Sequence, residues 1–413
     1  MRRYVELLAH PGFAGIFLAQ LLARSPVGIW SIGLLLYAEH RTGSYAAAGV
    51  VTAALTVGRA LGTPMMSRAV DRWGPRGVLG VSALGSGLAA IAVVLVDLSS
   101  QPTVLAVLGY GLLTALSGLL TPPVQPVVRA RFPRLLPQRV LVLAFSLDAA
   151  AQEVIFVLGP LLAFGIAALA GPGWTILSGV ALLWAGTAWI LTTAAAEAVP
   201  ASGTPARFGS VLRQPVVLLG TGICLLLVAA NSSVEAAMVA AFGSGGATGG
   251  ILLAVYSATS MVGGLAFARF AGGRWAQAGW LGVVTAGLGL AVFSVQPGWL
   301  AVALGLAGLG VAPVFAAVAW QVSTRVADHA ATEAYGWVDT GAIAGASLGF
   351  AAAGVVIETA AAPGALALAA GLALLACLLA LGAARVLRTP SRPGLEGAAA
   401  GGAAPRPDGG SAP

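Results

Sequence analysis

The chain has 413 residues, of which 58% are apolar and only 8% are charged, with a mean hydropathy of +0.93 and a formal net charge of +7. A soluble domain carries roughly 25% charged residues, so this composition excludes an ordinary soluble protein and indicates an integral membrane protein. Nucleic-acid binding is disfavoured despite the positive charge, because the basic residues stand beside apolar runs and are not interleaved with aromatic residues.

Apolar runs follow one another along the whole chain, and each is long enough to cross the hydrocarbon as a helix of about 20 residues. Twelve such spans are predicted, at Gly12–Tyr37, Tyr45–Ser67, Gly77–Leu98, Thr103–Val128, Val140–Leu169, Trp174–Ala195, Pro215–Phe242, Gly249–Phe270, Ala276–Val295, Trp299–Thr324, Thr332–Ile357 and Gly364–Leu387. The predicted fold class is therefore an all-α membrane protein.

The spans divide into two similar groups of six. We predict an N-terminal six-helix bundle at residues 1–195, a central cytoplasmic loop at 196–214, a C-terminal six-helix bundle at 215–388, and a disordered tail at 389–413 that is rich in Gly, Ala and Pro. The halves repeat each other, because Gly62 and Arg68 in the second span match Gly263 and Arg269 in the eighth. Two such halves joined by a central loop are typical of one large class of transporters.

The basic residues give the orientation. All 21 are Arg, and 18 of them lie at the ends of apolar runs or in alternate connections. Cytoplasmic loops retain positive charge, so these connections are predicted to be cytoplasmic, and an even number of spans puts both termini on the same side. The first run follows Met1-Arg2-Arg3 without a small-residue cleavage site, so we expect it to be a retained span. Arg without Lys, with abundant Ala and Gly, indicates a GC-rich bacterial genome. We therefore expect a multi-pass protein of the bacterial plasma membrane with both termini in the cytoplasm.

The connection between the second and third spans carries the most specific motif. It reads Ser-Arg-Ala-Val-Asp-Arg-Trp-Gly-Pro-Arg over residues 67–76. This resembles the signature loop of the major facilitator superfamily, in outline Gly-x-x-x-Asp-Arg-x-Gly-Arg-Arg. The matching positions are Asp71, Arg72, Gly74 and Arg76, whereas Ser67 and Pro75 depart from the pattern. The resemblance implies the fold of that family, with two pseudo-symmetric six-helix bundles.

The resemblance also implies that this loop acts as a cytoplasmic gate latch. Asp71 can meet a helix N-terminus or a nearby Arg, and Arg72 and Arg76 can pair with acidic residues of the other half. The alternative is that these arginines only set the topology. Gly159-Pro160 in the fifth span resembles the family's antiporter motif without its further glycines, and the alternative there is a simple helix kink.

Several ionisable residues fall inside predicted spans, where they usually face a cavity or a partner. Arg24 stands before Pro26 and Gly28, which are expected to break the helix, and it suits an anionic substrate group or a carboxylate partner. Glu153 is the first choice for proton coupling, because a carboxylate in apolar surroundings can exchange a proton near neutral pH. The alternative is a permanent pair of Glu153 with Arg24 or Arg59. For Arg59 itself, pairing and snorkelling to the surface both stay open.

Asp148 and Asp339 occupy equivalent places in the repeat, 25 residues after Pro123 and 26 after Pro313. Their symmetry argues for paired gating with the loop arginines. Asp148 is also a second candidate, after Glu153, for the proton-coupling residue. Predicted substrate-binding residues are Arg24, Asn231, Glu235, Tyr256 and Trp320, although Glu235 has the alternative of reaching interfacial water. A stripe of small residues at four-residue spacing is expected to form a helix–helix contact: Gly341, Gly345, Gly349 and Ala353.

These features predict a secondary transporter in the bilayer that works by alternating access, without cofactor or metal, and that binds a small molecule and protons. The resemblance to the major facilitator superfamily implies that it works as a monomer. The preferred interpretation is proton-coupled export of a small amphipathic compound, and the alternative is uptake of a small metabolite or organic anion by proton symport. An enzyme is disfavoured because no catalytic constellation stands out. An ATP-driven pump is disfavoured because there is no phosphate-binding loop and no Lys at all.

Overall fold

The computed structural model describes residues 2–98, 101–197, 208–242, 247–267, 270, 272–273 and 275–386. Every regular element in these ranges is a helix. This follows from the apolar composition, because a chain in lipid must satisfy its backbone hydrogen bonds within each segment. The predicted tail at 389–413, Arg269 and the middle of the predicted central loop lie outside the described residues.

For description, α1 to α9 form the N-terminal half. Its helices are α1 (Arg2–Leu8), α2 (Phe13–Arg24), α3 (Pro26–Thr42), α4 (Tyr45–Trp73), α5 (Pro75–Leu95), α6 (Thr103–Leu119), α7 (Val124–Leu135), α8 (Gln138–Ala170) and α9 (Pro172–Leu191), followed by the short 3-10 helix η1 (Ala194–Ala196). The first predicted span is α2 and α3, which meet at Ser25 because Pro26 has no N–H to continue the helix. The fourth is α6 with the first part of α7, and the two are separated by the segment that contains Pro122 and Pro123.

The C-terminal half contains the remaining helices. They are the 3-10 helix η2 (Ser210–Arg213), α10 (Pro215–Phe242), α11 (Ala247–Ala266), α12 (Ala276–Ala291), α13 (Pro297–Arg325), the 3-10 helix η4 (Asp328–Ala330) and α14 (Ala331–Val386). The last of these holds both the eleventh and the twelfth predicted spans, which meet at Ala361, where φ is 50°. Among the described residues, eight helical segments are long and apolar enough to cross a membrane. In this count α2 and α3 form one segment, α6 and α7 form another, and α14 is counted once.

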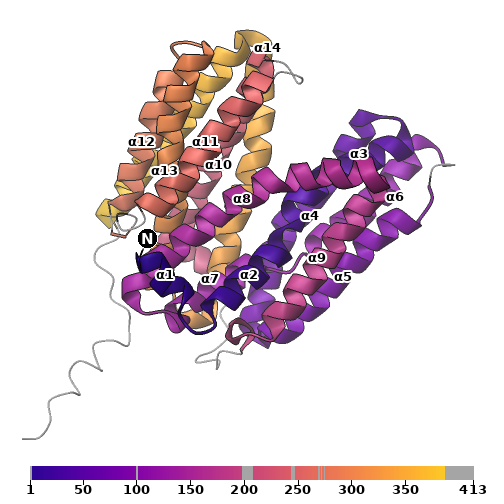
Figure 1. The fold of residues 1–413 in the computed structure, drawn as a ribbon, viewed down its shortest axis with the longest axis horizontal. Helices are drawn as coiled ribbons and strands as arrows, with labels where there is room; N and C mark the ends of the chain where they lie inside the picture. The colour runs from indigo at the N-terminus through magenta and orange to yellow at the C-terminus, as the bar shows by residue number, and fades with distance from the viewer. Residues whose placement is uncertain are drawn as a thin grey trace, which may run out of the picture.

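The two halves meet at one end of the molecule and diverge at the other (Figure 1). We call the end that carries the α4–α5 connection, the end of α7 and the start of α14 the loop end. Contacts between the halves run from α4, α7 and α8 of the N-terminal half to α11, α13 and α14 of the C-terminal half. Helices α3 and α14 extend away from this junction toward the opposite end, where the ribbons of the halves separate.

Close helix packing is built on glycine. A Cβ atom added to Gly341 would lie 2.5 Å from the carbonyl oxygen of Thr221. Gly345 and Gly349 meet the carbonyl oxygens of Leu225 and Ala229 in the same way, one turn further on at each step. The predicted small-residue stripe is therefore confirmed as the contact face of α14 against α10.

The internal repeat predicted from Gly62 and Gly263 is also visible in the packing. A Cβ atom on Gly62 would collide with the carbonyl oxygen of Leu119, and one on Gly263 with that of Leu309. The same close approach thus joins α4 to α6 in one half and α11 to α13 in the other. Equivalent glycines hold equivalent helix pairs, as expected for two related bundles.

Candidate functional site

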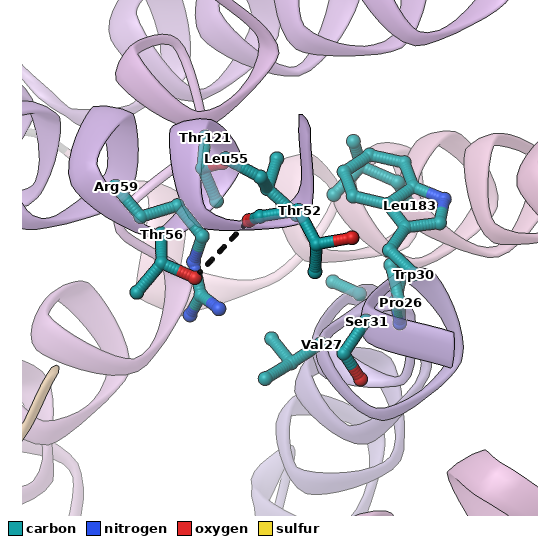
Figure 2. A pocket seen from close by; sticks show the side chains of 11 residues that line it. Pro26, Val27, Trp30, Ser31, Thr52, Leu55, Thr56, Arg59, Thr121 and Leu183 are labelled. Atoms are coloured by element: carbon teal, nitrogen blue, oxygen red, sulfur yellow. Dashed lines mark hydrogen bonds between the residues drawn. The ribbon is translucent and has the colours of Figure 1, made fainter. Parts of the chain in front are cut away.

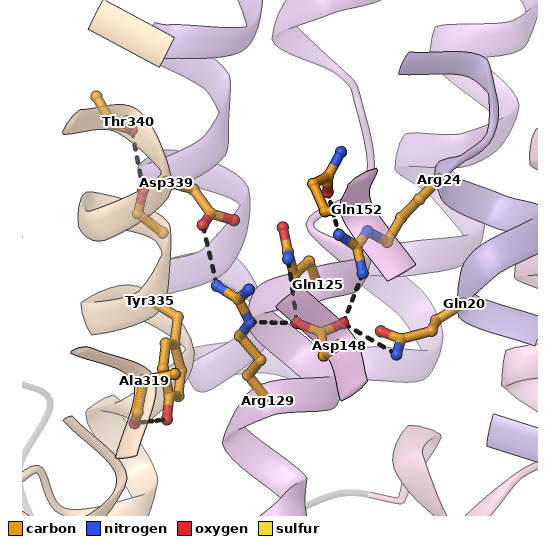
Figure 3. A network of polar contacts seen from close by, with 11 residues as sticks. Gln20, Arg24, Gln125, Arg129, Asp148, Gln152, Ala319, Tyr335, Asp339 and Thr340 are labelled. Carbon is orange, nitrogen blue, oxygen red and sulfur yellow. Dashed lines mark hydrogen bonds and ion pairs between the residues drawn. The ribbon is translucent and has the colours of Figure 1, made fainter. Parts of the chain in front are cut away.

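A buried ion-pair network lies where the halves meet, centred on Asp148 of α8 (Figure 3). The side chain of Asp148 is fully buried, and its carboxylate pairs with Arg24 at 2.6 Å and with Arg129 at 2.7 Å. The amides of Gln20 and Gln125 donate to the same carboxylate at 3.1 and 3.2 Å. Both oxygens of Asp148 are therefore saturated by donors from α2 and α7.

The network crosses to the other half through Arg129, which reaches Asp339 of α14 at 3.6 Å. Asp148 and Asp339 thus share one guanidinium group, that of Arg129 in α7. Their predicted gating with the loop arginines stays a prediction. Protonation of Asp148 would disrupt two buried ion pairs, an arrangement that argues against the predicted part of Asp148 in proton coupling.

Arg24 has a carboxylate partner, which was one of the two alternatives open from the sequence. It pairs with Asp148 and also donates to the side-chain oxygen of Gln152. The helix does break just after it, at Ser25 and Pro26, as predicted. Gly28 does not contribute to that break, since it lies within α3, where a Cβ atom would come within 2.5 Å of the Ile155 carbonyl oxygen.

Glu153 lies five residues beyond Asp148 on α8, on a different face of the helix, and has a different environment. Its carboxylate accepts a hydrogen bond from the hydroxyl of Ser260 on α11 at 3.0 Å, so this contact also joins the two halves. In the part of the chain that the structure describes, no arginine pairs with Glu153. The alternative of a permanent pair with Arg24 or Arg59 is therefore not what the structure contains.

Three predicted substrate-binding residues of the C-terminal half lie near Glu153 of the N-terminal half: Asn231, Glu235 and Tyr256. The hydroxyl of Tyr256 donates to the side-chain oxygen of Asn231 at 2.7 Å, which fixes the ring against α10. Glu235 is one turn further along α10, is exposed, and is close enough to Glu153 for their charges to interact. Trp320 lies near the loop end of α13 and packs against the same hydrophobic core that contains Tyr256.

The signature loop docks onto the start of α14. The carboxylate of Asp71 accepts a hydrogen bond from the backbone N–H of Glu333 at 2.8 Å, a position where a helix N-terminus favours negative charge. The side chain of Glu333 in turn pairs with Arg68 at 2.8 Å. Gly74 ends α4 with φ of 86°, which permits the sharp passage into α5 at Pro75.

The contacts predicted for Arg72 and Arg76 are not found in the described residues. Both side chains are exposed, and the guanidinium group of Arg72 lies 5.5 Å from the centre of the Trp73 ring. The ion pair across the halves comes from Arg68, because Arg68 and Asp71 are three residues apart and so share the face of α4 that meets α14. After the pairs Arg129–Asp339 and Arg68–Glu333, a third ion pair across the halves joins Arg134 to Asp328 at 2.9 Å.

The Gly159-Pro160 pair lies inside α8, whose helical assignment continues through it to Ala170. A Cβ atom added to Gly159 would lie 2.5 Å from the Cα atom of Gly28 on α3. Gly159 therefore serves a close crossing of α3 and α8, and the predicted kink at Pro160 stays a prediction.

Comparison with known proteins decides the family. The sequence model of the Major Facilitator Superfamily matches residues 15–319. The chain belongs to this superfamily. It is 29% identical over 216 residues to an uncharacterized MFS-type transporter, y4rN, of Sinorhizobium fredii (strain NGR234), a match that covers 52% of this chain and about half, 51%, of that protein.

Solved structures of transporters share the fold. A bacterial homologue of the iron transporter ferroportin in an outward-facing state superposes with a TM-score of 0.75, at 16% identity, over 90% of this chain and 99% of that one. The human organic anion transporter MFSD10 gives a TM-score of 0.65 at 16% identity, over 92% and 99%. This member of the superfamily is thus a multi-pass membrane protein with the MFS fold, and its family and fold indicate membrane transport.

Sequence reasoning missed several contact residues of this transporter. The sequence predicts no contact for Gln20, Arg68, Gln125, Arg129 or Glu333. One signal was available, because Gln20–Arg24 and Gln125–Arg129 are both spaced by four residues and so present two donors on one helix face. The partners across the halves had no signal in the sequence.

The docked loop gives a testable expectation. Replacing Glu333 with Gln removes the ion pair to Arg68, and one charge-assisted hydrogen bond contributes about 1.5–3 kcal/mol. We expect the loop end to open at least tenfold more often, measured as a change in the distance distribution between spin labels on α4 and α14 at that end. Arg41→Gln, which breaks an exposed ion pair to Asp97 within the N-terminal half, is the control. Equal distributions for wild type and Glu333→Gln would remove this pair from the latch.

Proposed function

We propose that this protein is a proton-coupled exporter of a small amphipathic compound that works by alternating access. The observation that carries the proposal is the hydrogen bond from Ser260 to Glu153, because it links a carboxylate of one half to a hydroxyl of the other. Glu153 has no basic partner in the described residues, so it can gain or lose a proton without breaking an ion pair. A proton on Glu153 would therefore alter a contact that must change when the halves rock.

The proposed cycle uses few groups. With the halves joined at the loop end, as in Figure 1, a proton that enters from the opposite end reaches Glu153 and promotes release of the exported compound. When the loop end opens, Glu153 loses the proton and the site accepts the next molecule. The polar group formed by Asn231, Glu235 and Tyr256 lies near Glu153 and is the proposed contact surface for the compound.

The arrangement of the halves supports this cycle. The bundles meet at the loop end and diverge at the other, and the ferroportin homologue that superposes with a TM-score of 0.75 is in an outward-facing state. The same two observations are compatible with the arginine distribution, which favours a cytoplasmic loop end. Coupling through Asp148 is not included in the proposal, because its carboxylate is held by two arginines.

The alternative is uptake of an organic anion by proton symport, with Arg24 as the anion-binding group. One similar protein, MFSD10, is an organic anion transporter, although the 16% identity supports only a common fold. Arg24 is already paired with Asp148 at 2.6 Å, so an anion would have to displace that carboxylate. The structure thus favours export over uptake through Arg24.

The test of proton coupling is a pH-sensitive dye assay in energised inside-out membrane vesicles, with a panel of lipophilic antibiotics, metabolites and organic anions. We expect a transported compound to dissipate the pH gradient in wild-type vesicles and to have no effect with Glu153→Gln. Glu358→Gln, the same change at an exposed position of α14, is the matched control and is expected to behave as wild type. A full response in Glu153→Gln vesicles would exclude Glu153 as the coupling residue.

We also propose that the protein lies in the plasma membrane with both termini in the cytoplasm. Alkaline phosphatase, which is active only outside the cytoplasm, is the reporter for the test. A fusion after Arg76 at the loop end is expected to be inactive, and one after Gln101 in the next connection to be active. The reverse pattern of activities would invert the proposed orientation.

A further inference from the structure

A small cavity lies inside the N-terminal half, between α3 and α4 (Figure 2). Its volume is about 60 Å³. Because a water molecule needs roughly 10–15 Å³ by this measure, the cavity has room for a group of about four non-hydrogen atoms. Arg59 is its one charged lining residue.

Arg59 differs from Arg24 and Arg129, the two arginines that hold Asp148. Arg24 and Arg129 each have a carboxylate partner, at 2.6 and 2.7 Å. Arg59 has no ion pair in the ranges that the structure describes, and its Nε atom is buried without a hydrogen-bond partner. The Arg59 side chain as a whole is half-buried, and its buried Nε atom has lost water without gaining a partner, which is costly.

The local charges leave one positive charge in excess. Asp339 and Arg24 are the charged residues close enough to Arg59 to interact with it, and both belong to the network around Asp148. This group contains the three cations Arg24, Arg59 and Arg129 but only the two carboxylates of Asp148 and Asp339. One monovalent anion would therefore balance the charge.

The cavity walls suit an anion that carries an apolar body. The hydroxyls of Ser31 and Thr56 make long hydrogen bonds of 3.4 Å to backbone carbonyls, so both can rotate to donate to a bound group. The indole N–H of Trp30 is already bonded to the carbonyl oxygen of Ile176 at 3.1 Å, which leaves its ring as an apolar surface. Val27, Leu55 and Leu183 complete the apolar side.

The cavity also lies next to a contact between the two halves. Ala60, the residue after Arg59, accepts a hydrogen bond from the hydroxyl of Thr340 on α14 at 3.2 Å. A ligand at Arg59 therefore lies one residue away from a contact that alternating access must change.

We propose that Arg59 binds the carboxylate group of the transported compound inside this cavity, and that the apolar body of the compound extends past the Trp30 ring and out of the open side of the cavity. The inference deepens the proposed function, on which it rests, because it assigns the substrate to the amphipathic monocarboxylates. The carboxylate accepts hydrogen bonds from the guanidinium group and from the hydroxyls of Ser31 and Thr56.

The test is equilibrium binding to the purified full-length protein in detergent, by isothermal titration calorimetry, without any pH gradient. Three probes share one apolar body and differ in the head group: 4-phenylbutanoate, 4-phenylbutanol and 4-phenylbutylamine. We expect wild type to bind the carboxylate on the order of tenfold to a hundredfold more tightly than the alcohol, and the amine most weakly. Equal binding of acid and alcohol to wild type overturns the proposal without any variant.

Variants then assign the effect to Arg59. Arg59→Gln is expected to reduce 4-phenylbutanoate affinity to that of the alcohol, and Arg59→Lys to keep part of the preference. Arg325→Gln, which removes another arginine whose Nε is buried without a partner, is the matched control. A carboxylate preference that survives in Arg59→Gln overturns the proposal, as does displacement of 4-phenylbutanoate by chloride at the same concentration, which would assign the cavity to an inorganic anion.

The binding assay and the vesicle assay fail separately. If Arg59-dependent carboxylate binding is found but no compound dissipates the pH gradient, the proton coupling is wrong and the assignment of Arg59 stands. If Glu153→Gln abolishes transport while Arg59→Gln binds the carboxylate as wild type does, the coupling stands and the assignment of Arg59 is wrong.

Discussion

Replacing Asp148 with Asn is expected to destabilise the fold by about 3–5 kcal/mol, because it leaves buried guanidinium groups without their shared carboxylate. Arg24 and Arg129 both pair with Asp148, and the side chains of all three are less than 10% exposed. Asn keeps the shape but has no charge, and its NH2 group would face the N–H donors of one of the two arginines while its oxygen accepts from the other. The loss is expected as a lower apparent melting temperature in detergent.

The contrast with a surface pair makes this prediction specific. Arg41 and Asp97 form an ion pair at 3.3 Å in which Asp97 is 64% exposed. Asp97→Asn is expected to change stability by less than about 1 kcal/mol, as exposed pairs usually do. The double variant Asp148→Asn with Arg24→Gln should recover part of the loss, since it removes one unpaired cation. Equal melting temperatures for Asp148→Asn and wild type would show that the network does not hold the helices together.

The fold was largely predictable from the sequence because the membrane limits the choices. Each predicted span is mainly helical in its described residues, and the predicted break at Pro26 is found, where a backbone donor is missing. The break at Pro122 and Pro123 was not predicted, since the fourth predicted span runs through both residues. The stripe that begins at Gly341 was also predictable, because close approach of two helix backbones requires a small residue at each turn. These signals are local and need no knowledge of the partner.

The site was less predictable because it depends on how each helix is rotated. In a soluble protein the apolar face of a helix points to the core, but in a membrane the lipid-facing side is equally apolar, so composition does not fix the rotation. Asp148 and Glu153 are five residues apart on α8, yet one binds two arginines and the other a serine. The same uncertainty explains why Arg68 and not Arg72 makes the ion pair to Glu333.

The second large effect is expected at the glycine stripe of α14. Gly345 packs against the carbonyl oxygen of Leu225 so closely that even a single added carbon atom must move the backbone of α10. Gly345→Ala is expected to destabilise the protein by about 1–3 kcal/mol, the usual effect of overpacking in a tight core. The measurement is again the apparent melting temperature in detergent.

A matched control lies in the same helix assignment. Gly371 also belongs to α14, but a Cβ atom added there has no neighbour within 4 Å. Alanine stabilises a helix interior by roughly 0.5–1 kcal/mol relative to glycine, and this gain is common to both positions. The difference between Gly345→Ala and Gly371→Ala therefore isolates the α10–α14 contact. If both variants melt at or above the wild-type temperature, α10 can shift without loss, and the stripe is not a fixed contact but one along which the two helices slide.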